Sequence, residues 1–298
     1  MEFSLIALDL DGTALQADHV SFSPRLSAAL LAAHRRGVAV VPITGRQFAM
    51  LPPAVPTGAE WEDLCVLCNG SEVRRLADGA LLDSHYMAAP LILALIDLAW
   101  RLDLPVELSA GGRLYLTGTD WERLRGIGGP LAFHLNTILS ARGRAVPDLT
   151  ALCREERLCF DKVNLPYLPT ERRAEVEAAL SALPLSFAWS SPRSIEITHR
   201  EATKAQGLLR ACSLLGVDSA RTLAIGDSGN DIPMLRAAGL GVAMGNAPQE
   251  VRDAAGAVTL SNAEDGAAAA VERYVLKASA AGATPESPAR APPARPPA

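Results

Sequence analysis

Short apolar runs alternate with amphipathic segments at both ends of this 298-residue chain, and this alternation constrains the fold most strongly. Near the N-terminus, residues 3–10 and 38–43 are predicted buried strands on either side of a helix over residues 24–36, which Gly37 ends. The same rhythm returns as a helix, a strand, a helix and a strand over residues 201–215, 222–225, 232–238 and 241–243. Such βα units predict an α/β fold with a Rossmann-like, largely parallel sheet built from both ends of the chain.

The middle of the chain has a different pattern. Within residues 84–190, alternating pieces at residues 113–117 and 158–165 are typical of antiparallel strands, and residues 91–102 carry apolar side chains on one face of a helix. We therefore predict an α/β core domain made of residues 1–83 and 191–277 and an inserted α+β domain over residues 84–190. The Ala- and Pro-rich residues 278–298 are predicted to be a disordered tail.

Two carboxylates follow the first predicted strand, in the sequence Asp9-Leu10-Asp11-Gly12-Thr13. Open parallel sheets bind their ligands just beyond the carboxyl ends of strands, so this position favours chemistry. Asp9 could attack an electrophile or bind a metal, while Asp11 could transfer a proton. The alternative interpretation is an ordinary Asx turn at a strand end.

A second acidic group, Asp227 to Asp231 in the sequence GDSGND, follows the predicted strand at residues 222–225. Asp227 and Asp231 could both face Mg²⁺, which prefers oxygen ligands, and Asn230 could orient one of these groups. The alternative is a helix N-terminus, where Asp, Ser and Asn are common.

Two further pieces of the sequence suit an anion. Thr44 and Gly45 follow the strand at residues 38–43, and a threonine hydroxyl with adjacent backbone N–H groups can hold a phosphate oxygen. Lys204, near the start of its predicted helix, could place an ammonium beside the same anion. Each of these features is common when it occurs alone.

In this order along the chain, DxDGT, TGR, a lysine and GDSxND resemble the four motifs of the haloacid dehalogenase (HAD) superfamily. Asn69-Gly70 with the hairpin-like segment after it, the SIEI sequence ahead of Lys204, GVAMGNAPQEVRDAA and SNAEDG look like the Cof-type (class IIB) branch. The resemblance implies a large α+β (C2-type) cap between the second and third motifs. It covers the core from residue 5 to about residue 274; in the cap it rests on position and size.

The resemblance implies a phosphatase that works through an aspartyl-phosphate. Asp9 would attack phosphorus, and Asp11 would protonate the leaving alkoxide and then activate water. The implied Mg²⁺ site consists of Asp9, Asp11 through its backbone carbonyl, Asp227 and Asp231. The phosphoryl group would be bound by Thr44, Gly45, Lys204 and Asn230.

The resemblance also implies a substrate class, namely a small phosphorylated metabolite such as a sugar phosphate or a similar monoester, whose leaving group the cap would recognise. Two alternatives remain open. A phosphomutase would use Asp9 in the same way and return the phosphoryl group to the product, and a non-catalytic protein could bind a metabolite with the same fold.

Composition and charge limit the classes of binding partner and the cellular location that we expect. With 28 basic and 33 acidic residues the net charge is −5, which argues against a general nucleic-acid binder. The longest apolar stretch, residues 88–96, is too short to cross a membrane, the first residues lack a basic signal-peptide region, and the five cysteines are scattered. These features predict a cytoplasmic protein; they do not fix its oligomeric state.

Several other residues are predicted to have no part in the site. Cys65 and Cys68 are expected to form a buried structural pair, and the five histidines are expected not to cluster. The glycines at residues 126–129 are predicted to lie in a loop. The tryptophans set aside in this way, each expected to pack in a core, are Trp100, Trp121 and Trp189.

Overall fold

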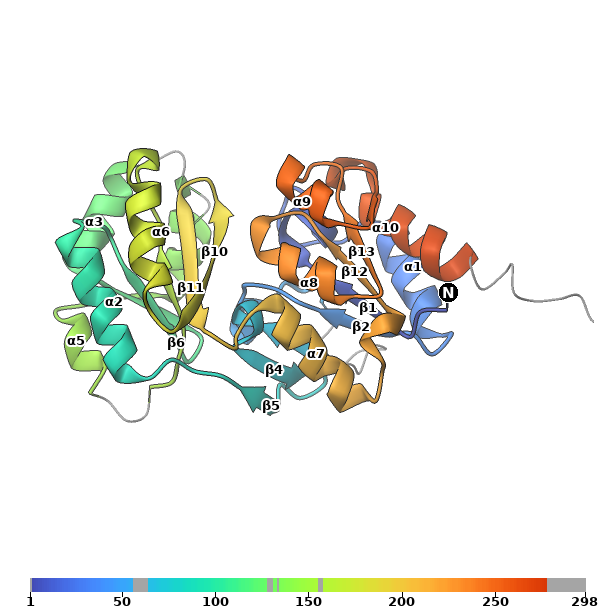
Figure 1. Cartoon of the computed structure of the whole chain (residues 1–298), viewed down its shortest axis with the longest axis horizontal. Helices are drawn as coiled ribbons and strands as arrows, with labels where there is room; N and C mark the ends of the chain where they lie inside the picture. The colour runs from blue at the N-terminus through green and yellow to red at the C-terminus, as the bar shows by residue number, and fades with distance from the viewer. Residues whose placement is uncertain (1, 56–63, 128–130, 133, 155–157, 278–298) are drawn as a thin grey trace, which may run out of the picture.

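The computed structural model describes residues 2–55, 64–127, 131–132, 134–154 and 158–277. Figure 1 shows two parts side by side, one built on a five-stranded sheet and the other on a six-stranded sheet. The predicted disordered tail lies outside the described residues, and so do the second and third glycines of the predicted loop, Gly128 and Gly129.

The five-stranded sheet is parallel throughout and has the order β14-β13-β12-β1-β2. Its strands are buried apolar segments that pack between two layers of helices, which explains their near-continuous hydrophobicity. The strands are β1 (Leu5–Leu8), β2 (Ala39–Pro42), β12 (Thr222–Gly226), β13 (Leu240–Ala243) and β14 (Ala257–Val258). The helices are α1 (Pro24–His34), α7 (Lys204–Leu215), α8 (Ile232–Ala237), α9 (Gln249–Ala254) and α10 (Gly266–Val271). The predicted α/β fold with a parallel sheet is confirmed.

Helix ends in this part follow the sequence signals. Ser23 caps α1 by accepting a hydrogen bond from the Leu26 N–H, and Pro24 occupies the first turn. Gly216, with φ of +67°, ends α7 in the left-handed conformation that glycine tolerates. A short antiparallel sheet lies beside β2, joined to it by an Ile43–Val66 bridge. Its strands are β3 (Leu64–Leu67), β4 (Glu72–Arg75) and β5 (Leu81–Ser84).

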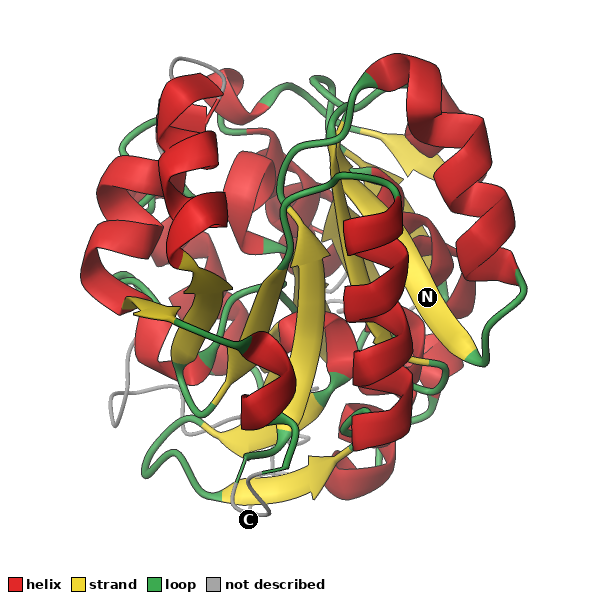
Figure 2. Ribbon diagram, turned by 90° about the vertical axis from the view of Figure 1, so that its left-hand side faces the viewer, coloured by secondary structure: helices red, strands yellow, loops and turns green. Residues whose placement is uncertain are grey.

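The second part has its own sheet, of order β10-β11-β9-β6-β7-β8, antiparallel except for the β7–β8 pair. The strands are β6 (Glu107–Ala110), β7 (Arg113–Thr117), β8 (Gly143–Val146), β9 (Phe160–Leu165), β10 (Leu185–Ser191) and β11 (Ser194–His199). Its helices are α2 (Ala89–Arg101), α3 (Gly118–Ile127), α4 (Ser140–Arg142), α5 (Leu149–Leu152) and α6 (Arg173–Ser181). Helices α2 and α6 lie on the outer face, so this sheet faces the first part (Figures 1 and 2).

Four details differ from the expectations. The six-stranded sheet runs to His199, so residue 190, where the inserted domain was expected to end, lies inside β10. Trp100 is 47% exposed because it lies on the outer side of α2, whereas Trp121 and Trp189 are partly buried against apolar clusters. Gly126 lies in α3 rather than in a loop. Two of the five histidines, His85 and His199, lie with ring centroids 5.7 Å apart, so these two do come together.

Two other findings concern expectations from composition. Cys65 and Cys68 are buried free thiols, as predicted. Among the described residues, no helix is both long and apolar enough to cross a membrane.

Candidate active site

The candidate site lies at the carboxyl edge of the five-stranded sheet. Asp9 follows β1, Thr44 comes just after β2, and Asp227 follows β12. Because β12, β1 and β2 are parallel neighbours, their carboxyl ends meet and bring these three residues together. The Asp9 N–H donates to the Ile225 carbonyl at 3.0 Å, which extends the strand pairing up to the first carboxylate.

Lys204 supplies the positive charge at the centre of this edge. It is the first residue of α7, whose N-terminus Thr203 caps, and its side chain is 2% exposed. Its Nζ lies 2.6 Å from Asp9 Oδ1 and 2.7 Å from Asp231 Oδ1. Burial alone would lower the pKa of Lys204, but the charges of Asp231 and Asp9 raise it above its ordinary value. The buried side chain is therefore an ammonium that bridges two carboxylates.

Asp231 organises the loop that follows β12. Its Oδ2 accepts hydrogen bonds from the backbone N–H groups of Asp227 and Ser228, each at 3.0 Å, while Oδ1 accepts from Lys204. The side chain is fully buried. Both oxygens of Asp231 therefore already have partners within the protein.

Asp9, Asp227 and Asp231 offer oxygen atoms that lie within 4.8 Å of one another. Burial and then the charge of Asp231 raise the pKa of Asp9 well above its usual value, and the same two causes raise the pKa of Asp227 to about 6. One ammonium thus leaves negative charge uncompensated among three carboxylates. A hard divalent cation with oxygen ligands would balance it, so these residues fit Mg²⁺.

Gly12 and Thr13 tie the first motif to Asp227. Gly12 has φ of +76°, and a Cβ at this position would collide with the Asp227 carboxylate. Thr13 Oγ1 donates to Asp227 Oδ1 at 2.8 Å. In the turn after β1, Gly12 therefore leaves space for the Asp227 carboxylate and Thr13 orients it.

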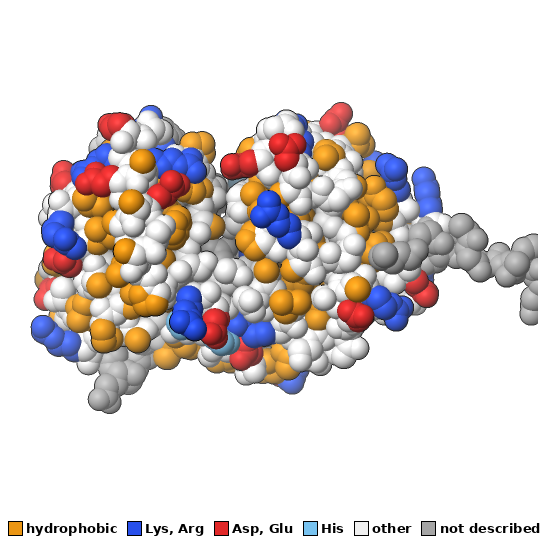
Figure 3. Space-filling view, in the orientation of Figure 1, with side chains coloured by type: hydrophobic (Ala, Val, Ile, Leu, Met, Phe, Trp, Pro, Cys, Tyr) orange, Lys and Arg blue, Asp and Glu red, His pale blue; other side chains and the backbone are white. Residues whose placement is uncertain are grey.

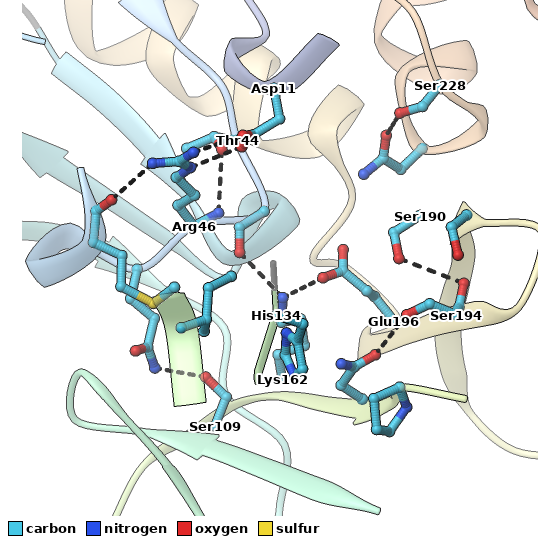
Figure 4. Close-up of a pocket in the computed structure, with 18 of the residues that line it drawn as sticks. Asp11, Thr44, Arg46, Ser109, His134, Lys162, Ser190, Ser194, Glu196 and Ser228 are labelled. Carbon is cyan, nitrogen blue, oxygen red and sulfur yellow. Dashed lines mark hydrogen bonds and ion pairs between the residues drawn. The ribbon is translucent and has the colours of Figure 1, made fainter. Parts of the chain in front are cut away.

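Asp11 pairs with Arg46 rather than with Lys204 (Figure 4). Arg46 Nε lies 2.7 Å from Asp11 Oδ2 and Nη2 lies 2.6 Å from Oδ1, while His19 Nδ1 is 3.1 Å from Oδ1. Burial would raise the pKa of Asp11, but the hydrogen bonds and charge of Arg46, followed by those of His19, hold it below its usual value. Sequence reasoning gave Arg46 no role, although its place directly after Thr44 and Gly45 was a usable signal.

The residues predicted to bind phosphate lie around the same opening. Thr44 is almost fully buried, and its Oγ1 accepts the Arg46 N–H at 3.2 Å. Asn230 Nδ2 donates to Asn69 Oδ1 at 3.2 Å, and Asn230 Oδ1 accepts from Ser228 at 2.6 Å. The Gly45 carbonyl accepts from Lys162 at 3.2 Å.

A cavity of about 450 Å³ lies between the two parts of the molecule. Every predicted site residue except Asp231 lines it: Asp9, Asp11, Thr44, Gly45, Lys204, Asp227 and Asn230. The opposite wall includes polar side chains from the second part: Glu107, Ser109, His134, Lys162, Asn164 and Glu196. The structure thus brings the motif residues together under a polar wall that sequence reasoning did not assign.

Glu107 and His134 form one charged pair of that wall. His134 Nε2 lies 2.7 Å from Glu107 Oε1, and Asn164 Nδ2 donates to Glu107 Oε2 at 3.3 Å. Burial would lower the pKa of His134, but the charge and hydrogen bond of Glu107 raise it. The pairs Glu107/Ser109 on β6 and Lys162/Asn164 on β9 stand two positions apart in buried strands, and this spacing is the signal that could have revealed them.

Lys162 and Glu196 link the wall to the first part. They form a buried ion pair; Lys162 also donates to the Gly45 carbonyl, and Asn69 Nδ2 donates to Glu196 Oε2 at 2.6 Å. Burial would raise the pKa of Glu196, but the charge of Lys162 lowers it, so the pair remains ionised. Figure 4 shows the Lys162 and Glu196 side chains meeting below Thr44 and Arg46.

Comparison with known proteins agrees with this geometry. A family model described as haloacid dehalogenase-like hydrolase matches residues 6–271. Phosphatase YwpJ of Bacillus subtilis is 30% identical over 292 residues, covering 89% of this chain and 97% of that protein. The B. subtilis 5-amino-6-(5-phospho-D-ribitylamino)uracil phosphatase YcsE is 28% identical, covering 93% and 97%. A solved haloacid dehalogenase-like hydrolase from B. subtilis superposes with a TM-score of 0.79 at 27% identity, covering 91% of this chain and 100% of that one.

Proposed function

The chain belongs to the haloacid dehalogenase-like hydrolases and is a phosphatase of that family, and from this premise we propose that it hydrolyses a small phosphorylated metabolite through an aspartyl-phosphate on Asp9, with Mg²⁺. A sugar phosphate or a similar monoester is the proposed substrate class, and the cytoplasm is the proposed location. One observation carries the proposal: a buried carboxylate on the cavity, held by a buried ammonium, lies beside two further carboxylates.

Asp9 is the proposed nucleophile. Lys204 occupies its Oδ1, which leaves Oδ2 to attack phosphorus as the bond to the ester oxygen breaks. Water then attacks the phosphorus of the aspartyl-phosphate, which frees inorganic phosphate and restores Asp9. The Lys204 ammonium, with Thr44, the Gly45 N–H and Asn230, stabilises the transferring phosphoryl group through fixed charge and hydrogen bonds.

The metal is proposed to be held by Asp9, the Asp11 carbonyl and Asp227. When bound, Mg²⁺ supplies positive charge between the carboxylates and the phosphate. Asp231 also belongs to the acidic cluster, but both of its oxygens already accept hydrogen bonds. We therefore assign it to orient Lys204 and the Asp227 loop.

Asp11 is the proposed proton-transfer group. It would give a proton to the leaving alkoxide in the first step and take one from the attacking water in the second. The Arg46 pairing favours the ionised form, which is the form required in the second step. Arg46 is therefore a positioning residue that acts through Asp11.

The leaving group is proposed to lie against the wall formed by Glu107, His134 and Asn164. A cavity of about 450 Å³ suits a small metabolite, and a carboxylate, an imidazole and an amide can pair with several hydroxyl groups. Such a wall favours a polyhydroxylated leaving group over an apolar one, because an apolar group could not use the hydrogen-bonding positions that these paired side chains still offer.

The test is phosphate release from a panel of sugar phosphates, nucleotides and phosphorylated cofactors, measured with Mg²⁺ or with EDTA. We expect release that needs the metal and is greatest for sugar phosphates. A requirement for a bisphosphate activator would instead identify a phosphomutase. Tight binding of one of these compounds without turnover would identify a binding protein.

A further inference from the structure

Two segments connect the two parts of the molecule, and each carries a histidine at the crossing. His85 is the first residue after β5, and His199 is the last residue of β11. Their rings lie 5.7 Å apart, centroid to centroid, with planes tilted by 41°. Figure 3 shows histidine, basic and acidic side chains gathered at the surface where the two parts meet.

Glu201 completes a cluster at this junction. Ligand atoms of His85, His199 and Glu201 all lie within 4.8 Å of one another. Glu201 Oε2 is 3.4 Å from His85 Nδ1, which is longer than the roughly 2.7–2.9 Å of a charge-assisted hydrogen bond. It is close to the separation of about 3.3 Å between two ligands that each lie about 2.0 Å from a tetrahedral zinc ion.

The surroundings suit a cation with nitrogen ligands. His199 Nδ1 accepts the Glu201 N–H at 3.2 Å, so an ion that binds this nitrogen would have to replace that hydrogen bond. A further carboxylate, Asp83, lies 3.6 Å from His85 Nε2 and is paired with Arg210 at 2.9 Å.

We propose that His85, His199 and Glu201 form a second metal site, separate from the Asp9 site, for a borderline divalent ion such as Zn²⁺. Imidazole suits zinc and its neighbours in the transition series, whereas Mg²⁺ prefers oxygen ligands. Three protein ligands leave a position for water. Because the ligands come from both connecting segments, the bound ion ties residues 85–88 to residues 200–203 and restrains relative movement of the two parts.

The site is tested by titrating the protein with Co²⁺, which reports a tetrahedral nitrogen site by visible absorption, while excess Mg²⁺ occupies the Asp9 site. We expect one Co²⁺ per chain, displaced by Zn²⁺. His199→Gln and Glu201→Gln should each weaken binding at least tenfold. Glu201 is half exposed, so its variant tests the site even if a histidine variant fails to fold.

Two matched variants serve as controls. His34→Gln removes an imidazole in the last turn of α1, and Cys159→Ser removes an exposed thiol; both should bind Co²⁺ like the wild type. The proposal is overturned if the wild type binds no Co²⁺ in excess Mg²⁺. It is equally overturned if His199→Gln and Glu201→Gln bind Co²⁺ like the wild type, or if Cys159→Ser abolishes binding.

The restraining effect has its own readout. Amide hydrogen exchange at residues 85–88 and 200–203 should slow when Zn²⁺ is added to the wild type and should not change in His199→Gln. If the wild type binds the ion and its amide hydrogen exchange does not change, the ion does not restrain the two connecting segments. None of these measurements depends on turnover of a phosphate ester.

Discussion

At the scale of single residues, the buried ammonium of Lys204 holds the site together. It separates Asp9 from Asp231, which would otherwise place two carboxylates side by side in a buried pocket. Removing one partner from such a group is costly because it leaves the remaining charges buried and unpaired. Lys204 is therefore expected to matter for stability as well as for catalysis.

Lys204→Met should lower the free energy of unfolding by about 3–5 kcal/mol in EDTA, as for other broken buried ion pairs. Mg²⁺ should restore part of this loss, because the ion compensates the same carboxylates. Urea unfolding with and without Mg²⁺ measures both effects. Lys277→Met, at an exposed lysine, is the control and should change stability by less than about 0.5 kcal/mol. Equal losses in the two variants would contradict the central place of Lys204.

Arg46→Met should lower kcat by about tenfold to a hundredfold and change KM less, because Asp11 loses the two hydrogen bonds that fix it. Steady-state phosphate release gives both constants. Arg142→Met removes a guanidinium that contacts the Ala49 carbonyl and does not pair with Asp11. If this control loses as much kcat as Arg46→Met, the effect of Arg46 is not specific to Asp11.

His134 should make stability depend on pH. Its folded pKa lies above the ordinary 6.5, so the stabilisation from Glu107 is fully present below pH 6.5 and is lost as the pH rises through the folded value. The difference in unfolding free energy between the wild type and His134→Gln should thus be larger near pH 5.5 than near about pH 8.5. Urea unfolding at the two pH values measures it. In a Glu107→Gln background the pH dependence should disappear; its persistence there would assign it to another group.

The motif residues could be predicted because strand order alone brings them together. Asp9, Thr44 and Asp227 each follow a buried strand, and parallel neighbours end at one edge. Arg46 follows Thr44 and Gly45 directly, but its pairing with Asp11 depends on how two turns of the first part face each other. The place of Glu107 and His134 on the cavity wall depends on how the two parts meet. The contact between His85 and His199 was also missed, because these residues are far apart in the sequence and meet only where the two connecting segments run side by side.

At the scale of elements, the turn after β1 links backbone geometry to the proposed metal site. Gly12 and Gly37 have almost the same positive φ, +76° and +78°. A Cβ at Gly12 would meet Asp227, whereas nothing lies within 4 Å of a Cβ at Gly37. Substitutions at the two glycines therefore distinguish the effect of backbone strain from the effect of a collision with the Asp227 carboxylate.

Gly12→Ala and Gly37→Ala should each lose about 1–2 kcal/mol of stability, because an L-residue is strained at this φ. Only Gly12→Ala should also weaken Mg²⁺ binding, since its methyl group displaces the Asp227 carboxylate. Calorimetric Mg²⁺ titration and urea unfolding of both variants measure the two effects. Equal Mg²⁺ affinity in Gly12→Ala and the wild type would show that Asp227 does not need its present position.

Strands buried on both faces were the easiest elements to predict. β1, β2 and β12 are continuous apolar runs that end at polar turns, so residue type marks both their nature and their limits. β10 is only partly buried along its length, so the sequence contains no comparable mark of where the second sheet ends. The exposure of Trp100 on α2 could not be predicted either, because periodicity does not show how wide a face is covered.

At the scale of the whole molecule, the site is complete only where the two parts meet. Lys162 and Glu196 of the second part contact Gly45 and Asn69 of the first, and Gln47 donates to Ser109 at 2.6 Å. These contacts hold a polar wall opposite the carboxylates and set the size of the cavity. The proposed recognition of the leaving group and the proposed attack by Asp9 thus depend on the same arrangement.

Asp9 is proposed to carry the phosphoryl group during turnover, and trapping the phosphorylated protein would detect this intermediate directly. The protein is mixed with its best substrate and Mg²⁺, quenched in acid within one turnover and digested for mass spectrometry. We expect a phosphoryl adduct on the peptide that contains Asp9, and neither adduct nor phosphate release from Asp9→Asn. An adduct on another residue, or turnover by Asp9→Asn at a tenth of the wild-type rate or more, would show that Asp9 is not the nucleophile.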